Sequence, residues 1–143
     1  MRKQAGFTLM EIMITIVIVA VLAGIAYPIY LHYVKGARRS SAITALQRAA
    51  AAEEKHYATY NRYATSLTAL GYLSNSVDIP SSSEHWYTLS AGPDPSGNSA
   101  YELMAAPAGS QVGDACGKYI LTGTGSRLLT GNTKSVEQCW GGG

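Results

Sequence analysis

The sequence is poor in charge and in reactive side chains. Charged residues make up 14% of its 143 residues, against about 25% in an average protein, and there are two cysteines and three histidines. His32, His56 and His85 are far apart and share no motif, which argues against a metal site or a histidine-based catalytic group. Gly123-Thr-Gly125 is not followed by Gly-Lys-Ser/Thr, which excludes a phosphate-binding P-loop there.

Acidic chemistry is equally sparse. Asp78, Asp94 and Asp114 are isolated in segments that we expect to be loops, whereas a calcium site needs several oxygen ligands close together. Glu53 and Glu54 are adjacent, and adjacent helical positions point apart, which argues against a catalytic carboxylate pair. We therefore predict no enzymatic activity, no metal and no cofactor, and we expect a structural role.

The dominant feature is an apolar run near the start. From Phe7 to Leu31 the only charged residue is Glu11, and no charge lies between Ile12 and Tyr27. As a helix this segment would measure about 37 Å, more than the roughly 30 Å of a bilayer's hydrocarbon core. It can therefore span a membrane. A charge at the bilayer centre costs about 2.5–3.5 kcal/mol, so we expect Glu11 to meet a cation in a second copy of the chain.

The residues around this carboxylate carry a motif. Arg2-Lys-Gln-Ala-Gly6 precedes Phe7-Thr-Leu-Met-Glu11 and the apolar run, which resembles the class III signal of type IV pilins. The resemblance implies that a membrane prepilin peptidase/N-methyltransferase cleaves after Gly6 and N-methylates the new amino-terminal Phe7. It also implies that Glu11, fifth in the mature chain, neutralises the terminal amine of a neighbouring Phe7 during filament assembly.

Two other interpretations of the apolar run compete with this one. A secretory signal peptide has an apolar region of about 7–15 residues followed by a small-residue cleavage site. The run is longer than that, and Ala-Gly-Ile-Ala at 23–26 matches such a site poorly. The other alternative is a plain signal anchor in which Glu11 is accidental.

Positive charge lies on both sides of this span. Arg2 and Lys3 precede it, as the positive-inside rule expects for the cytoplasmic side, and their removal would leave nine basic side chains against nine acidic ones. Such a balanced chain is not a general nucleic-acid-coating protein. Lys35, Arg38 and Arg39 follow the span and oppose the rule, so we interpret them as contacts to lipid headgroups or to other subunits.

The apolar run is predicted to continue as one helix from Phe7 to about Tyr63. Pro28 lacks an N–H, so the carbonyl of Gly24 loses its helical partner, and we expect a kink or a short melted stretch near 24–28. We hypothesise that Gly24 and Pro28 let the subunit lengthen under load. The predicted organisation is a cleaved leader at 1–6, a transmembrane and filament-core helix at 7–31, an amphipathic helix half at 32–64 and a globular head at 65–143.

The head is predicted to contain a small antiparallel sheet. Strands are expected at 86–91, 100–106 and 118–122 in a meander, and Val136–Trp140 is expected to form a fourth strand or an edge. A helical turn is expected at 65–70, and 74–84 reads as irregular. The fold class is therefore α+β, a type IV pilin fold with a long kinked N-terminal helix packed on a sheet of three or four strands.

Two cysteines mark the C-terminal part of the head. Cys116 and Cys139 lie beyond the span, and two cysteines in a small exported domain indicate a disulfide bounding a C-terminal loop; two free buried thiols are the alternative. The stretch Asp114-Ala-Cys-Gly-Lys-Tyr-Ile-Leu-Thr122, with Cys139-Trp140, is similar to the C-terminal half of certain minor pilins. Related pilins that take up DNA share this pattern.

The two resemblances imply a structural subunit of a type IV pilus, a minor pilin needed for assembly and for twitching motility or adhesion. The implied partners are other pilin subunits in a helical filament, the prepilin peptidase and the inner-membrane assembly machinery. The implied location is the inner membrane and then the filament on the cell surface. One alternative is a DNA-binding pilin of natural competence, which would need a basic stripe of Lys118, Arg127 and Lys134 on one face. Another is a type II secretion pseudopilin, which the Cys-Trp tail disfavours.

Overall fold

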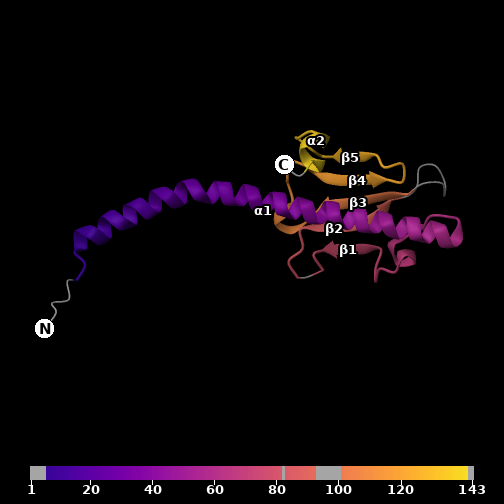
Figure 1. The fold of residues 1–143 in the computed structure, drawn as a ribbon, viewed down its shortest axis with the longest axis horizontal. Helices are drawn as coiled ribbons and strands as arrows, with labels where there is room; N and C mark the ends of the chain where they lie inside the picture. Colours follow the sequence, from indigo (N-terminus) through magenta and orange to yellow (C-terminus); the bar gives the residue numbers. More distant parts are fainter. Residues whose placement is uncertain (1–5, 82, 93–100, 142–143) are drawn as a thin grey trace. The chain divides into compact units, whose positions relative to one another are not determined.

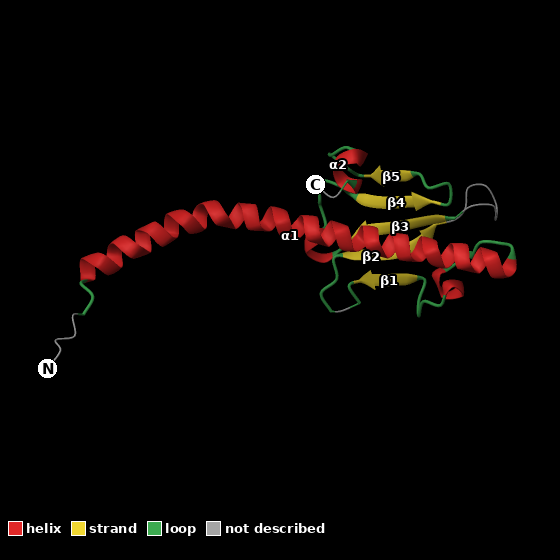
Figure 2. Cartoon of the chain, in the orientation of Figure 1, coloured by secondary structure: helices red, strands yellow, loops and turns green. Residues whose placement is uncertain are grey.

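A computed structural model describes residues 6–81, 83–92 and 101–141 as a long helix and an antiparallel sheet (Figures 1 and 2). The chain divides into two compact units, residues 1–34 and 35–143. Helix α1 (Leu9–Tyr60) contributes to both units. Most of the predicted leader, Asp94 and the first residue of the strand expected at 100–106 lie outside the described residues.

Helix α1 begins at a capping threonine and continues past a proline. The hydroxyl of Thr8 accepts a hydrogen bond from the backbone N–H of Glu11 at 3.3 Å, which is the usual N-cap contact. The helix then runs without interruption through Gly24 and Pro28. Pro28 removes one hydrogen bond, and the apolar helical residues on both sides keep the backbone helical. The melted stretch is therefore absent from this structure, and extension of the subunit at this point stays a prediction.

The sheet is a simple meander in which strands neighbouring in sequence pair side by side. All neighbouring strands are antiparallel, which confirms the predicted arrangement, but five strands form the sheet instead of the expected three or four. Their bounds are β1 Ser76–Ile79, β2 Tyr87–Gly92, β3 Glu102–Pro107, β4 Lys118–Thr122 and β5 Arg127–Thr130.

Two of the element predictions were wrong. The segment read as irregular contains β1, a strand of four residues that the polar residues Ser76 and Asp78 and the following Pro80 hide from pattern analysis. Val136–Trp140 is not a strand but helix α2, because Ser135 caps it: its hydroxyl accepts from the N–H of Gln138, whose side chain accepts from the N–H of Ser135. This reciprocal capping box starts a helix even in a short segment.

The core forms where one face of α1 meets one face of the sheet. Figure 1 shows the second half of α1 lying across the sheet. Along α1 the buried positions are spaced by three or four residues, which places them on a single stripe: Arg39, Ala42, Leu46, Ala49 and Glu53. The sheet contributes alternate residues, fully or almost fully buried, as a half-buried strand requires: Tyr87, Leu89, Leu103, Ala105 and Tyr119. A short helical turn (Leu67–Leu70), as predicted, adds the buried Leu67.

A buried acid lies at the far end of this stripe. The side chain of Glu53 is fully buried, and one of its oxygens accepts a hydrogen bond from the N–H of Ala64 at 2.8 Å. Its other oxygen, Oε1, has no hydrogen-bond partner. Burial raises the pKa of Glu53, and the hydrogen bond from Ala64 offsets part of that rise. The ionised carboxylate is therefore a weak point of the fold.

Replacing Glu53 by glutamine is expected to stabilise the chain at neutral pH by about 1 kcal/mol. The amide oxygen keeps the bond to Ala64, and no charge is left at this position. Because the pKa of Glu53 is higher in the folded chain than in the unfolded one, its ionisation costs stability as pH rises between those two values. The gain of Glu53→Gln over wild type should thus shrink toward acidic pH, as measured by thermal unfolding in detergent.

The matched control is Glu54→Gln, because Glu54 is exposed and adjacent. It should change the unfolding free energy by less than about 0.5 kcal/mol. A lower unfolding temperature for Glu53→Gln than for wild type at neutral pH would contradict the assignment.

Candidate functional site

The residues of the predicted processing and assembly motif lie at the start of the first unit. Phe7 is 79% exposed, and Glu11 lies in the first turn of α1 with an exposed side chain. Among the residues that the structure describes, no ion pair involves Glu11. The roles predicted for Gly6, Phe7 and Glu11 require other molecules and stay predictions.

The apolar part of α1 has no cover of its own. Its most apolar 18-residue window has a mean hydropathy of 2.6, and none of that window is buried in the chain. By length and composition this helix is able to cross a membrane. Nothing in the described residues packs on it, so a lipid phase or other chains must supply the contact surface.

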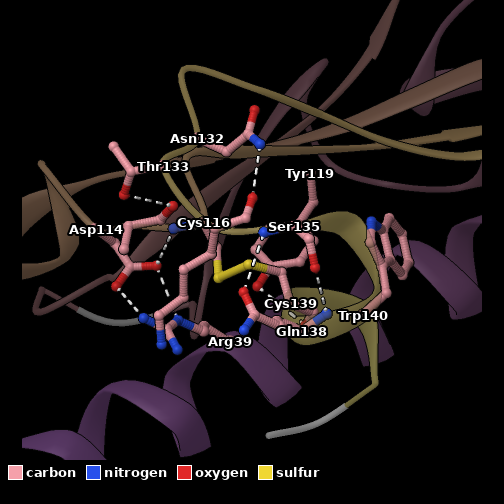
Figure 3. Close-up of a disulfide and its surroundings, with 12 residues drawn as sticks. Arg39, Asp114, Cys116, Tyr119, Asn132, Thr133, Ser135, Gln138, Cys139 and Trp140 are labelled. Carbon is pink, nitrogen blue, oxygen red and sulfur yellow. Dashed lines mark hydrogen bonds and ion pairs between the residues drawn. A yellow bond between two sulfur atoms is a disulfide. The ribbon is translucent and has the colours of Figure 1, made fainter.

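The second group of candidate residues surrounds a disulfide between Cys116 and Cys139. The bond joins the segment leading into β4 to helix α2, which confirms the predicted pairing (Figure 3). Beside it, the rings of Tyr119 and Trp140 pack edge to face, with centroids 5.3 Å apart. The indole N–H of Trp140 donates to the carbonyl of Leu128 at 3.3 Å. The disulfide, the aromatic pair and this hydrogen bond thus hold α2 against β4 and β5.

An ion pair connects this region to α1. Arg39 donates to both carboxylate oxygens of Asp114, from Nε at 2.8 Å and from Nη2 at 2.6 Å, and both side chains are buried. Asp114 also accepts from the N–H of Cys116 at 3.2 Å. Burial alone would raise the pKa of Asp114, but the hydrogen bonds from Arg39 and Cys116 outweigh it and lower that pKa. The interpretation of Arg39 as a headgroup or subunit contact was therefore wrong.

Sequence reasoning missed this pair for a simple reason. The two residues are 75 positions apart in the sequence, and an isolated acid in a loop and a basic residue on a helix carry no shared pattern. The sequence did contain one signal, a charged residue among the core-facing positions of the helix. Arg39 lies on the same helical stripe as Ala42 and Leu46, and a charge on a core-facing stripe needs a partner.

The three cations proposed to contact DNA do not form one stripe on the sheet. In the β4–β5 pair, Lys118 faces Thr130 and Leu121 faces Arg127. Opposed residues share a face of the sheet, and faces alternate along a strand. Lys118 and Arg127 therefore lie on opposite faces.

The surroundings of these cations also differ. The guanidinium of Arg127 lies 5.5 Å from the centroid of the Trp140 ring, on the face that packs toward α1. Lys134 is half-buried in the segment before α2. DNA binding by Lys118, Arg127 and Lys134 as one surface is thus not supported by the register.

The remaining candidate residues are dispersed. Within the described ranges, no group of three or more His, Cys, Asp or Glu side chains is placed to hold a metal ion. His85 lies 3.7 Å from Asp78, and His56 contacts the carbonyl of Arg62 at 2.9 Å. These are local contacts at the edge of the head.

Comparison with known families finds matches for both parts of the chain. Residues 1–27 match the family described as the prokaryotic N-terminal methylation motif. Residues 28–120, more than half of the chain, match the family described as "Type IV minor pilin ComP, DNA uptake sequence receptor".

Individual relatives agree with these matches. The chain is 37% identical over 76 residues to the type IV major pilin protein PilE1 of Neisseria gonorrhoeae, over 53% of this chain and 46% of that protein. It is likewise 37% identical over 76 residues to a fimbrial protein of Neisseria meningitidis serogroup A, over 53% of this chain and 44% of that protein. The matches thus span about half the length of these relatives.

A solved structure of a type IV pilin from Shewanella oneidensis has a similar fold. Its TM-score is 0.50 at 30% sequence identity, and the superposition covers 71% of this chain and 98% of that one.

Removing the acid of the buried ion pair is expected to destabilise the head strongly. Asp114→Ala leaves the Arg39 guanidinium buried without a counter-charge, which costs about 3–5 kcal/mol. The double variant Arg39→Met/Asp114→Leu should lose much less, because neither charge is then buried. Urea unfolding under non-reducing conditions measures both, and equal losses in the two variants would contradict a paired charge.

The same pair should govern the acid limit of the fold. Since the folded chain lowers the pKa of Asp114, the pair stabilises above the ordinary aspartate value, and this stabilisation is lost as pH falls through the lowered value. Asp114→Asn should show a weaker loss of unfolding free energy on acidification than wild type.

Proposed function

Because the chain belongs to the type IV pilin family, within the ComP minor pilin group, we propose that it is a minor subunit of a type IV pilus. The observation that carries this proposal is the succession of an N-terminal methylation motif over residues 1–27 and a ComP-type pilin region over residues 28–120. Members of this family are structural subunits that assemble with other pilins after prepilin processing.

Processing would act on the residues that precede α1. On this proposal a prepilin peptidase/N-methyltransferase cleaves after Gly6 and methylates the amine of Phe7. The described part of this segment lies ahead of the helix and is exposed, which supports access by such an enzyme. The mature chain would wait in the inner membrane, held by the apolar part of α1, until the assembly machinery transfers it to the filament.

Assembly would depend on the charge at Glu11. A carboxylate surrounded by hydrocarbon is costly on its own, and its attraction to an ammonium group is much stronger there than in water. The amine of Phe7 in a neighbouring subunit supplies that ammonium group. Docking of one apolar helix beside another is thereby favoured in one axial register, because only that register pairs the two charges. The Gly24–Pro28 stretch would let the helix extend under load.

A second candidate function is DNA uptake in natural competence. The description of the matched family as a DNA uptake sequence receptor favours it. The β4–β5 register argues against a single stripe of Lys118, Arg127 and Lys134, so a duplex would reach Lys118 and Arg127 from different faces. A type II secretion pseudopilin is not favoured by any of the comparisons.

Replacing Glu11 tests the assembly role. Glu11→Ala and Glu11→Gln should be cleaved and methylated normally but should enter filaments about tenfold less. A loss of about 1.4 kcal/mol in the free energy of pairing changes the equilibrium constant tenfold. Processing is read by mass spectrometry of the membrane fraction, and incorporation by immunoblotting of sheared pili. The control Glu137→Gln changes an exposed acid of the head and should assemble normally. Wild-type incorporation of both Glu11 variants would contradict the proposal.

Deletion of the gene separates the two candidate functions. An assembly role predicts fewer pili and a parallel loss of motility and adhesion. A DNA-uptake role predicts a large loss of transformation while the number of pili stays near wild type. Counting pili by electron microscopy and scoring transformation in the same strain distinguishes them, and complementation with the full chain is the control.

A further inference from the structure

Arg38 has a fixed but largely unsatisfied guanidinium. Its Nη1 donates to the hydroxyl of Ser110 at 2.7 Å, and its guanidinium carbon lies 4.9 Å from the centroid of the Trp86 ring. These contacts orient the group and occupy one of its several N–H donors. Its Nε is buried and makes no hydrogen bond. An arginine held over an aromatic ring in this way is well suited to bind a phosphate or carboxylate.

Arg39, the next residue, differs from Arg38 in having an acidic partner. Arg39 is neutralised by two hydrogen bonds to Asp114. The other ion pair in the described part of the chain joins His85 to Asp78. Arg38 takes part in neither, although its side chain is half-buried. Among the ion pairs of the described residues none includes Arg38, so an anion from outside the chain is able to pair with it.

A hollow of about 370 Å³ lies against the groups that support this arginine. Besides Trp86 and Ser110 it is lined by Gly109, Ser83, His85 and Glu84. The serine hydroxyls can donate to an anion.

Lys35 places a second cation near Arg38. It is exposed and precedes Arg38 by one helical turn, so the two side chains lie on the same side of α1. The side-chain N–H of Gln111 contacts the carbonyl of Lys35 at 3.4 Å, and Gln111 follows Ser110 directly. This end of the head thus brings together two cations and a hydroxyl.

The position of these cations in the chain indicates what they meet. Arg38 follows Leu31, the last residue of the predicted span, by about two turns, or about 10 Å of helix. The headgroup region extends about 5–7 Å beyond the hydrocarbon core on each side, so Arg38 lies near its outer boundary. Arginine and lysine on the far side of a span also run against the positive-inside rule, so a compensating anion on that side is expected.

We propose that Arg38, Lys35 and Ser110 bind the phosphodiester of an anionic phospholipid, in the leaflet that faces the head, while the chain is anchored in the membrane. Trp86 supports the guanidinium and supplies the amphipathic ring that membrane interfaces favour. The proposal rests on the membrane-anchored stage of the proposed function. Nucleic acid is disfavoured, because a duplex needs cations spaced along a surface and this site has two.

The test uses the full chain in nanodiscs of phosphatidylcholine, with or without a minor fraction of phosphatidylglycerol. Native mass spectrometry counts the lipids that stay bound after release. Wild type should retain phosphatidylglycerol in preference to phosphatidylcholine, and Arg38→Gln should reduce this retention about tenfold, the loss expected for a charge-assisted contact. Arg38→Lys and Ser110→Ala should give intermediate losses. The control Arg48→Gln removes an exposed arginine of the same helix and should have no effect.

Several outcomes would overturn the proposal. One is equal retention by wild type and Arg38→Gln; another is an equal loss in Arg48→Gln, which would indicate nonspecific attraction. Displacement of the lipid by inorganic phosphate would assign the site to free anions, and displacement by a short DNA duplex would assign it to nucleic acid. Circular dichroism and the intact disulfide verify folding; if Arg38→Gln misfolds, Arg38→Lys and Ser110→Ala decide. Failure to insert into either nanodisc would overturn the membrane stage as well, whereas the other outcomes leave it intact.

Discussion

The head depends on the buried ion pair between Arg39 and Asp114. It is the contact in which the first core-facing position of α1, the segment before β4 and the backbone beside the disulfide meet. The hydrophobic stripe that follows along α1 is built largely from alanine, which buries little area. A directional, bidentate contact at the start of such a stripe fixes the axial position of the helix on the sheet, which nonpolar packing of small side chains alone specifies weakly.

The two units of the chain differ in how their apolar residues are covered. The head has a buried hydrophobic core of its own. The first unit exposes an apolar helix with a carboxylate near its start, and nothing in the described residues covers it. The head therefore has a packed core within the chain, whereas the apolar helix depends on lipid or on other subunits for its contacts. This division suits a protein that is stored in one environment and used in another.

Much of this arrangement was predictable from sequence, for identifiable reasons. The long helix, the strands β2 to β4 and the disulfide follow from apolar runs, alternation and cysteine number, all of which are local signals. Strands β1 and β5 have four residues each, too few for a period to register, and α2 depends on one capping box that was overlooked. The Arg39–Asp114 contact depends on tertiary position, and the separation of Lys118 from Arg127 depends on strand register. Neither can be predicted from a local sequence pattern.

Strand β5 lies at an edge of the sheet and pairs with β4 alone. The faces of a strand exchange with every residue of register shift. Gain or loss of a single residue in the β4–β5 turn would therefore rotate Arg127 to the outer face and Leu128 inward, while the other four strands kept their places. Insertions and deletions in this turn offer related chains a short evolutionary route to a different surface chemistry on an unchanged scaffold.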